Sequence, residues 1–299
     1  MRKQLQEHLE KRVQQCVALN RDQNPVCLKM EKKKECLSNR SGEIVKAKAL
    51  GKIKNKLNDS DVEKVFYHVH FQYLINHKGN IYIEEEVEER IAEFYKGVLV
   101  DDEEINVYEL DGTNEATEEE FIEDTSERTS YMYDRLKAVR YAEQWWNSYN
   151  PAFRKFEVDC TNYISQCIHA GGAPMIGYPN RSSGWWMRRD NWAYTWTVAH
   201  SLRWFLPNSK QGLKGKEVSS PKELKLGDII CYDFQGDGRF DHTTIVTAKD
   251  ADGMPLVNAH TTNSRMRYWA YEDSTAYTPN IKYKFFHILD STTGVKGST

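Results

Sequence analysis

A cysteine at the predicted start of a helix is the residue in this chain best placed for nucleophilic chemistry. Cys160 follows Asp159, whose carboxylate can accept the unpaired N–H groups of a first helical turn. The apolar residues after it recur at helical spacing, and Gly171-Gly172 can take the left-handed turn that ends a helix. The positive end of a helix dipole favours thiolate and lowers a cysteine pKa from ~8.5 to roughly 3.5–7.5. The pattern therefore predicts an activated thiol.

A histidine that opens a predicted strand supplies a candidate general base. His242 follows a polar turn that separates two strand-like segments. Ala251-Asp252-Gly253 then forms a hairpin loop, and the chain returns antiparallel toward His260. The partner of His242 falls within a residue or two of His260, and side chains two apart share a strand face. Asn258 and His260 are therefore both candidates to orient the imidazole.

Each of these residues alone has an ordinary structural explanation. A buried cysteine is more often a small apolar residue than a nucleophile, and we expect both Cys167 and Cys231 in the core. The combination is more specific, because a nucleophile, a base and an orienting polar group together form a complete catalytic set. The sequence therefore predicts chemistry of the cysteine–histidine type.

The order of these motifs resembles the putative amidase domain of Gram-positive, spore-forming bacteria. More widely, it is similar to papain-like cell-wall enzymes: the cysteine, histidine-dependent amidohydrolase/peptidase class and the NlpC-type endopeptidases. The resemblance covers residues 130–290 and is carried by Asp159-Cys160-Thr161-Asn162, Gly184-Trp185-Trp186 and the segments 224–228, 237–244 and 256–259. It implies a papain-like fold, Cys160 as nucleophile, His242 as base and peptidoglycan peptide or amide bonds as substrate. Related hairpins carry His-Ala where this chain has Asn258-Ala259, which favours Asn258 over His260 without deciding between them.

Three functions fit this set of residues. In the first, a cysteine amidase or peptidase, the Cys160 thiolate attacks an amide carbonyl and His242 moves the proton to the leaving amine. The backbone N–H of Cys160 would stabilise the oxyanion, and no metal or other cofactor is needed. The alternatives are a non-catalytic module that binds wall peptide or glycan, and acyl transfer through the same thiol.

Three tryptophans lie between the nucleophile and the base in the sequence. We expect Trp185, Trp186 and Trp196 to border the cleft, because tryptophan stacks on sugar rings and clamps peptide backbone. The alternative is that they fill the core of a domain with few helices.

Two groups of polar residues raise the question of a metal site. One group has a spacing similar to that of a calcium loop, but Thr244 stands where the glutamate at position twelve is expected. Its members are Asp233, Gln235, Asp237 and Asp241. His68 and His70 share a strand face without an apparent third ligand. We therefore predict a polar turn at 233–241 and no metal.

Charge and hydropathy limit the classes of partner. The net charge of -3 does not point to a nucleic acid, although residues 1–60 are basic and 84–127 acidic. Mutual attraction of these solvated surfaces is the preferred interpretation, and contact of the basic part with anionic wall polymer is the alternative. No signal peptide and no membrane span of ~18 apolar residues is visible. We expect a cytoplasmic location, with cell-wall or spore association as an alternative.

The predicted fold class is α+β. A smaller α+β accessory domain (1–108) precedes an acidic linker (109–130), a papain-like amidase domain (131–290) and a disordered tail (291–299). In the amidase domain, a helix-borne cysteine packs on an antiparallel, barrel-like sheet. In the accessory domain, apolar spacing predicts helices over 1–20 and 42–57, and alternation from Val62 predicts a hairpin that turns at Lys78-Gly79-Asn80.

Overall fold

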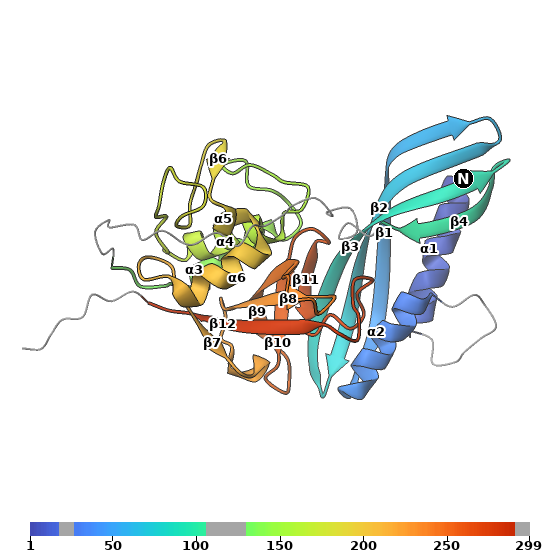
Figure 1. Ribbon diagram of the computed structural model, residues 1–299. Coiled ribbons are helices and arrows are strands. Elements are labelled where there is room, and N and C mark those ends of the chain that lie inside the picture. Colours follow the sequence, from blue (N-terminus) through green and yellow to red (C-terminus); the bar gives the residue numbers. More distant parts are fainter. Residues whose placement is uncertain (18–26, 106–129, 291–299) are drawn as a thin grey trace, which may run out of the picture.

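Two groups of helices flank a long antiparallel sheet (Figure 1). The computed structural model describes residues 1–17, 27–105 and 130–290. Its helices are α1 (Arg2–Val17), α2 (Leu28–Asn39), α3 (Arg135–Trp145), α4 (Cys160–Ala170), α5 (Tyr194–Thr197), α6 (Ala199–Asn208) and the 3-10 turn η2 (Pro221–Glu223). Its strands are β1 (Gly42–Asp59), β2 (Val62–His77), β3 (Asn80–Tyr95), β4 (Val98–Glu104), β5 (Met187–Arg188), β6 (Asn191–Trp192), β7 (Gly215–Val218), β8 (Ile229–Asp233), β9 (His242–Lys249), β10 (Pro255–Ala259), β11 (Ser264–Tyr268) and β12 (Lys282–Ile288).

The amino-terminal strands and the carboxy-terminal strands belong to one sheet, with the order β1-β2-β3-β11-β10-β9-β8-β12-β7 and β4 beside β3. The seam between the two halves lies where Ser264 and Arg265 of β11 pair with Glu86 and Glu85 of β3. The predicted accessory and amidase domains therefore share backbone pairing. Most of the predicted linker and the predicted tail lie outside the described residues.

The predicted hairpin is confirmed. β2 and β3 pair along their whole lengths, and the turn between them has positive φ at Lys78 and Gly79. Alternate side chains of β2 are buried beneath α1 and α2, as an amphipathic strand requires. The predicted helix over 1–20 is confirmed as α1 within the described residues, whereas the predicted helix over 42–57 is wrong. That segment is the edge strand β1, which is mostly exposed. Its apolar residues therefore do not show the strict alternation that would identify a strand.

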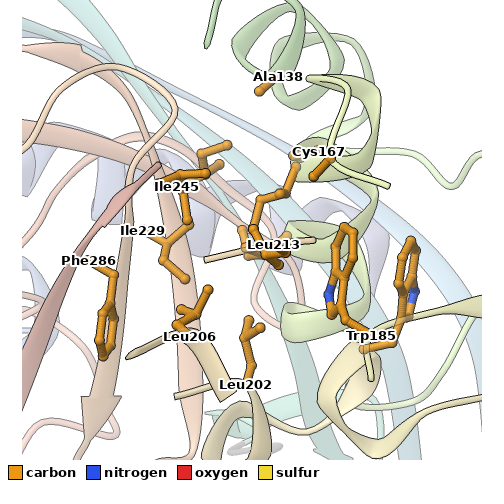
Figure 2. Close-up of a cluster of buried hydrophobic side chains, with 14 of the residues drawn as sticks. Ala138, Cys167, Trp185, Leu202, Leu206, Leu213, Ile229, Ile245 and Phe286 are labelled. Carbon is orange, nitrogen blue, oxygen red and sulfur yellow. The ribbon is translucent and has the colours of Figure 1, made fainter. Parts of the chain in front are cut away.

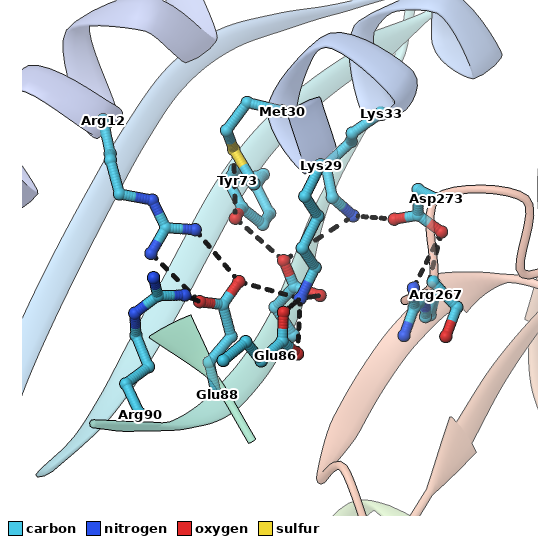
Figure 3. A network of polar contacts seen from close by, with 12 residues as sticks. Arg12, Lys29, Met30, Lys33, Tyr73, Glu86, Glu88, Arg90, Arg267 and Asp273 are labelled. Carbon is cyan, nitrogen blue, oxygen red and sulfur yellow. Dashed lines mark hydrogen bonds and ion pairs between the residues drawn. The ribbon is translucent and has the colours of Figure 1, made fainter. Parts of the chain in front are cut away.

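Buried charges hold the amino-terminal helices on the sheet (Figure 3). Arg12 of α1 and Lys29 of α2 both bind the Glu88 carboxylate, at 3.0 and 2.7 Å. Lys33 of α2 contacts Glu84 and also lies 2.6 Å from Asp273 in the loop after β11. The predicted attraction between basic and acidic segments is therefore present, but these charges are buried rather than solvated.

The second core lies between the sheet and the helices α3, α4 and α6 (Figure 2). Ile229 and Ile245 of the sheet face Cys167 of α4 and Leu202 of α6, and Trp185 closes one end. The apolar side chains of α4 thus pack against this core, which helps to fix where its first residue lies. Among the residues described, no helix combines the length and the apolar character that crossing a bilayer requires.

Candidate active site

The start of α4 is held by Asp159, but not in the predicted way. The Asp159 carboxylate accepts hydrogen bonds from the Phe156 backbone N–H (2.9 Å) and the Asn162 side chain (2.8 Å). Its other oxygen lies 2.8 Å from Nδ1 of His260. The prediction that this carboxylate caps the first helical turn is therefore wrong, because its oxygens are used by other groups. The end of the helix is as predicted, at Gly171-Gly172.

A threonine that sequence reasoning missed caps the helix instead. The Oγ1 of Thr261 accepts hydrogen bonds from the backbone N–H groups of Asp159 and Cys160, both at 3.1 Å. Thr261 has φ 82, which is unusual for a β-branched residue. Its position directly after the β10 hairpin strand was the one available signal, and it does not reveal the contact with a residue 101 positions away.

The Cys160 thiol is buried, with 1% of the residue exposed. Its Sγ lies 3.7 Å from Thr161 Oγ1 and 3.9 Å from the backbone oxygen of Asp241. Burial raises the pKa of the thiol, and hydrogen bonds from Thr161 and the Thr243 backbone only partly oppose this. The prediction of a lowered cysteine pKa is therefore wrong for this conformation, because desolvation outweighs the helix terminus.

The structure brings the start of α4 against the start of β9. The Cys160 sulfur touches the residue before His242, and the Thr161 hydroxyl lies 3.1 Å from the hydroxyl of Thr243, the residue after it. These two contacts bracket His242 across 82 positions of sequence. The predicted nucleophile and base thus come from adjoining element ends.

The His242 imidazole lies on the opposite face of β9 from Thr243. In the β8–β9 pairing, His242 lies opposite Tyr232. The imidazole lies 6.0 Å from the Phe234 ring, with 24° between the two ring planes. Nε2 of His242 is 3.4 Å from Oη of Tyr271. Burial raises the pKa of this tyrosine, whose hydroxyl also lies 3.2 Å from that of Ser264.

Burial lowers the pKa of His242 to about 3, with a smaller contribution from the Arg267 guanidinium. The imidazole is consequently neutral at physiological pH. Arg267 is itself buried and paired with Asp273 at 2.8 Å, which connects this environment to Lys33 of α2. A neutral imidazole and a protonated thiol are thus the resting forms.

The two candidates for the orienting residue have other partners. The Nδ1 of His260 contacts Asp159 and its Nε2 contacts the Trp145 carbonyl, both at 2.8 Å. His260 therefore holds the start of α4 and does not orient the His242 imidazole. The Asn258 side-chain oxygen accepts from Thr247 and from the Met266 backbone, and its Nδ2 donates to Glu143. Tyr271 contacts the imidazole through its hydroxyl, and the rings of Tyr232 and Phe234 also lie beside it.

The structure contradicts the prediction that the three tryptophans line a cleft. Trp185, Trp186 and Trp196 are fully buried. The indole N–H groups of Trp185 and Trp196 donate to Ser165 and Asn162 of α4, respectively. Trp185 and Trp196 therefore belong to the core behind α4, which was the alternative interpretation, whereas the Trp186 indole donates to the Asn180 and Ser183 carbonyls.

The residues that were considered for metal binding have other roles. The Asp233 carboxylate accepts backbone N–H groups of Gly236, Asp237 and Gly238, which is the predicted polar turn. His70 instead lies 2.8 Å from Glu85 across the β2–β3 pair. Within residues 1–17, 27–105 and 130–290, no group of three or more metal-binding side chains gathers.

Comparisons with known proteins identify a family and two relatives of this chain. The family described as "Putative amidase domain" matches residues 132–286. The uncharacterized protein YhbB of Bacillus subtilis (strain 168) is 52% identical over 271 residues, which cover 88% of this chain and 87% of that protein. The uncharacterized protein YjcM of the same strain is 31% identical over 140 residues, or 44% of this chain and 31% of that protein. No solved structure matches. This chain belongs to the putative amidase domain family, whose description indicates hydrolysis of an amide bond.

Proposed function

We propose that this protein is a cysteine amidase of papain-like type that uses Cys160 as nucleophile and His242 as base. One observation carries the proposal: the first residues of α4 lie against the first residues of β9, with the cysteine and histidine at these two element starts. Membership of the amidase family supplies the reaction class.

The resting protonation states suit a mechanism in which the base takes the thiol proton during attack. A neutral His242 accepts that proton as the sulfur bonds to the amide carbonyl. The imidazolium then protonates the leaving amine as the C–N bond breaks, and water hydrolyses the thioester. In the resting structure Nε2 of His242 lies 3.4 Å from Oη of Tyr271, and loose contacts of this kind are common at the catalytic groups of free enzymes.

In the proposed mechanism, two backbone N–H groups stabilise the negative charge that develops on the substrate carbonyl oxygen. The amides of Asp159 and Cys160 converge on a single oxygen, the Thr261 hydroxyl. In the proposed mechanism, the carbonyl oxygen of the substrate takes that position as it gains negative charge. Removing one such donor from a hydrolase costs about 100- to 1000-fold in kcat.

The supporting roles differ from those that the sequence suggested. His260 and the Asp159 carboxylate hold the helix start, and Tyr271 holds the imidazole in the resting enzyme. Asn258 joins β10 to α3 through Glu143. None of these four side chains needs to touch the substrate.

We propose a peptide or amide bond of peptidoglycan as the substrate, on the resemblance of the cysteine and histidine motifs to cell-wall enzymes. A non-catalytic binding module is less well supported, because Trp185, Trp186 and Trp196 are buried and offer no stacking surface. Acyl transfer uses the same thioester and is recognised by the appearance of amide products when an amine is added.

The test is hydrolysis of purified Gram-positive peptidoglycan fragments, followed by mass spectrometry and by assay of newly exposed amines. We expect the wild type to release amines and Cys160→Ala to release none. Cys167→Ala is the matched control, because Cys167 is a second buried cysteine of the same helix. Equal release by Cys160→Ala and the wild type would refute the cysteine mechanism.

A further inference from the structure

We propose that Thr261 closes the active site by occupying the oxyanion position with its own hydroxyl. This inference rests on the proposed function, since it concerns the site where the substrate oxygen would bind. It adds a regulatory device: the resting enzyme is self-blocked, and the segment 261–263 must move before a carbonyl can bind.

The contacts of Thr261 match those that a substrate oxygen would make. Its Oγ1 accepts both N–H groups at the start of α4, at 3.1 Å each. The same side chain partly opposes the rise that burial causes in the pKa of the Cys160 thiol. One hydroxyl therefore occupies both oxyanion donors, one of which is the backbone N–H of Cys160 itself. A carbonyl cannot be attacked by the sulfur and reach these donors while that hydroxyl is present.

The backbone at Thr261 indicates a conformation held by its surroundings. A φ of 82 is unfavourable for a β-branched residue, and such strain persists where the neighbouring structure fixes it. On one side, His260 is held by hydrogen bonds at both ring nitrogens. On the other, the Asn263 carbonyl accepts the Val87 backbone N–H at 2.8 Å.

That second anchor comes from the amino-terminal half of the sheet. Immediately after Asn263, Ser264 and Arg265 pair with Glu86 and Glu85 of β3, and the Arg265 guanidinium lies 2.8 Å from the Glu85 carboxylate. The strand β3 thus holds the segment that carries Thr261. A loosened seam between β3 and β11 would release the segment and open the site.

The competing explanation is that Thr261 is a permanent helix cap. It predicts that loss of the hydroxyl slows the reactions of Cys160 instead of accelerating them. If the Thr261 hydroxyl only caps α4, its loss disorders the helix start and slows every reaction of Cys160. If the hydroxyl blocks the oxyanion position, its loss frees two donors and accelerates reactions that pass through an oxyanion.

The experiment compares two reactions of Cys160 in the full chain. Acylation by p-nitrophenyl acetate forms an oxyanion, whereas alkylation by iodoacetamide does not, and peptide mass spectrometry assigns each product to Cys160. Thr261→Gly removes the hydroxyl and suits the positive φ, and Thr261→Ser is the control that retains the hydroxyl. We expect acylation of the Gly variant to be about 5- to 100-fold faster than in the wild type, as loss of two competing hydrogen bonds implies, with a smaller change in alkylation.

Unchanged or slower acylation of Thr261→Gly, relative to its alkylation, would overturn the proposal. Glu85→Gln tests the seam separately, because Glu85 lies on β3 and pairs with Arg265, which also binds Glu143 of α3. We expect faster acylation in this variant too, and an unchanged rate would show that β3 does not hold the segment 261–263. Both reactions use small reagents, so they succeed or fail independently of whether the enzyme cleaves peptidoglycan.

Discussion

The buried His242 should make the protein sensitive to acid. Its pKa is lowered to about 3 in the folded protein, whereas an unfolded histidine titrates near ~6.5. Because the unfolded state binds this proton first, the free energy of unfolding falls as the pH drops from about 6.5 toward 3. Going down to pH 5 spans about 1.5 pH units, which corresponds to about 2 kcal/mol at 1.36 kcal/mol per unit.

Urea unfolding at pH 7.5 and pH 5.0, followed by tryptophan fluorescence, measures this loss of unfolding free energy. We expect the wild type to lose about 2 kcal/mol more than His242→Gln over this interval, because the variant lacks the titrating group. His169→Gln, at a half-buried histidine, controls for the loss of an imidazole and should follow the wild type. Burial raises the pKa of Asp241 to about 6, which opposes the trend, but this contribution is common to all three proteins. Equal acid sensitivity of the wild type and His242→Gln would refute the reasoning.

Two further predictions concern stability. Trp185→Ala should reduce the free energy of unfolding by about 3–5 kcal/mol, because it leaves a cavity behind α4, whereas the exposed Trp204→Ala should cost under about 1 kcal/mol. Denaturant unfolding decides this, and similar costs for both variants would contradict a core role for Trp185. Lys33→Met should cost about 3–5 kcal/mol, since it leaves buried Glu84 without its cation and Asp273 with Arg267 alone, and Lys32→Met on the exposed side of α2 should cost little. A near-neutral Lys33→Met in thermal unfolding would show that this network does not stabilise the fold.

Local patterns in the sequence predicted the elements that carry strong periodicity. The extent of α4 followed from its apolar spacing and from Gly171-Gly172. The β2–β3 hairpin followed from strict alternation and its turn. β1 did not, because Ile44, Ala47 and the other apolar residues of an edge strand also fit a helical spacing, and only pairing with β2 decides between the two.

The closed state of the site could not be predicted because it depends on contacts between distant segments. Thr261 lies 101 positions from Cys160, and the Thr261-Thr262 pair after a strand carries no signal of such a contact. Tyr271 reaches His242 from the loop after β11. The tryptophans have the composition of a sugar-binding cleft, and their burial depends on α4 packing over them.

A double-mutant comparison of Cys160→Ala and His242→Ala tests the central claim, that these two residues act as one catalytic pair. The measurement is the rate of amide hydrolysis of peptidoglycan fragments by the wild type, both single variants and the double variant. Residues that act as a unit are strongly non-additive, so we predict that all three variants fall to the same residual rate. Wild-type turnover by His242→Ala, or losses that multiply in the double variant, would contradict the account.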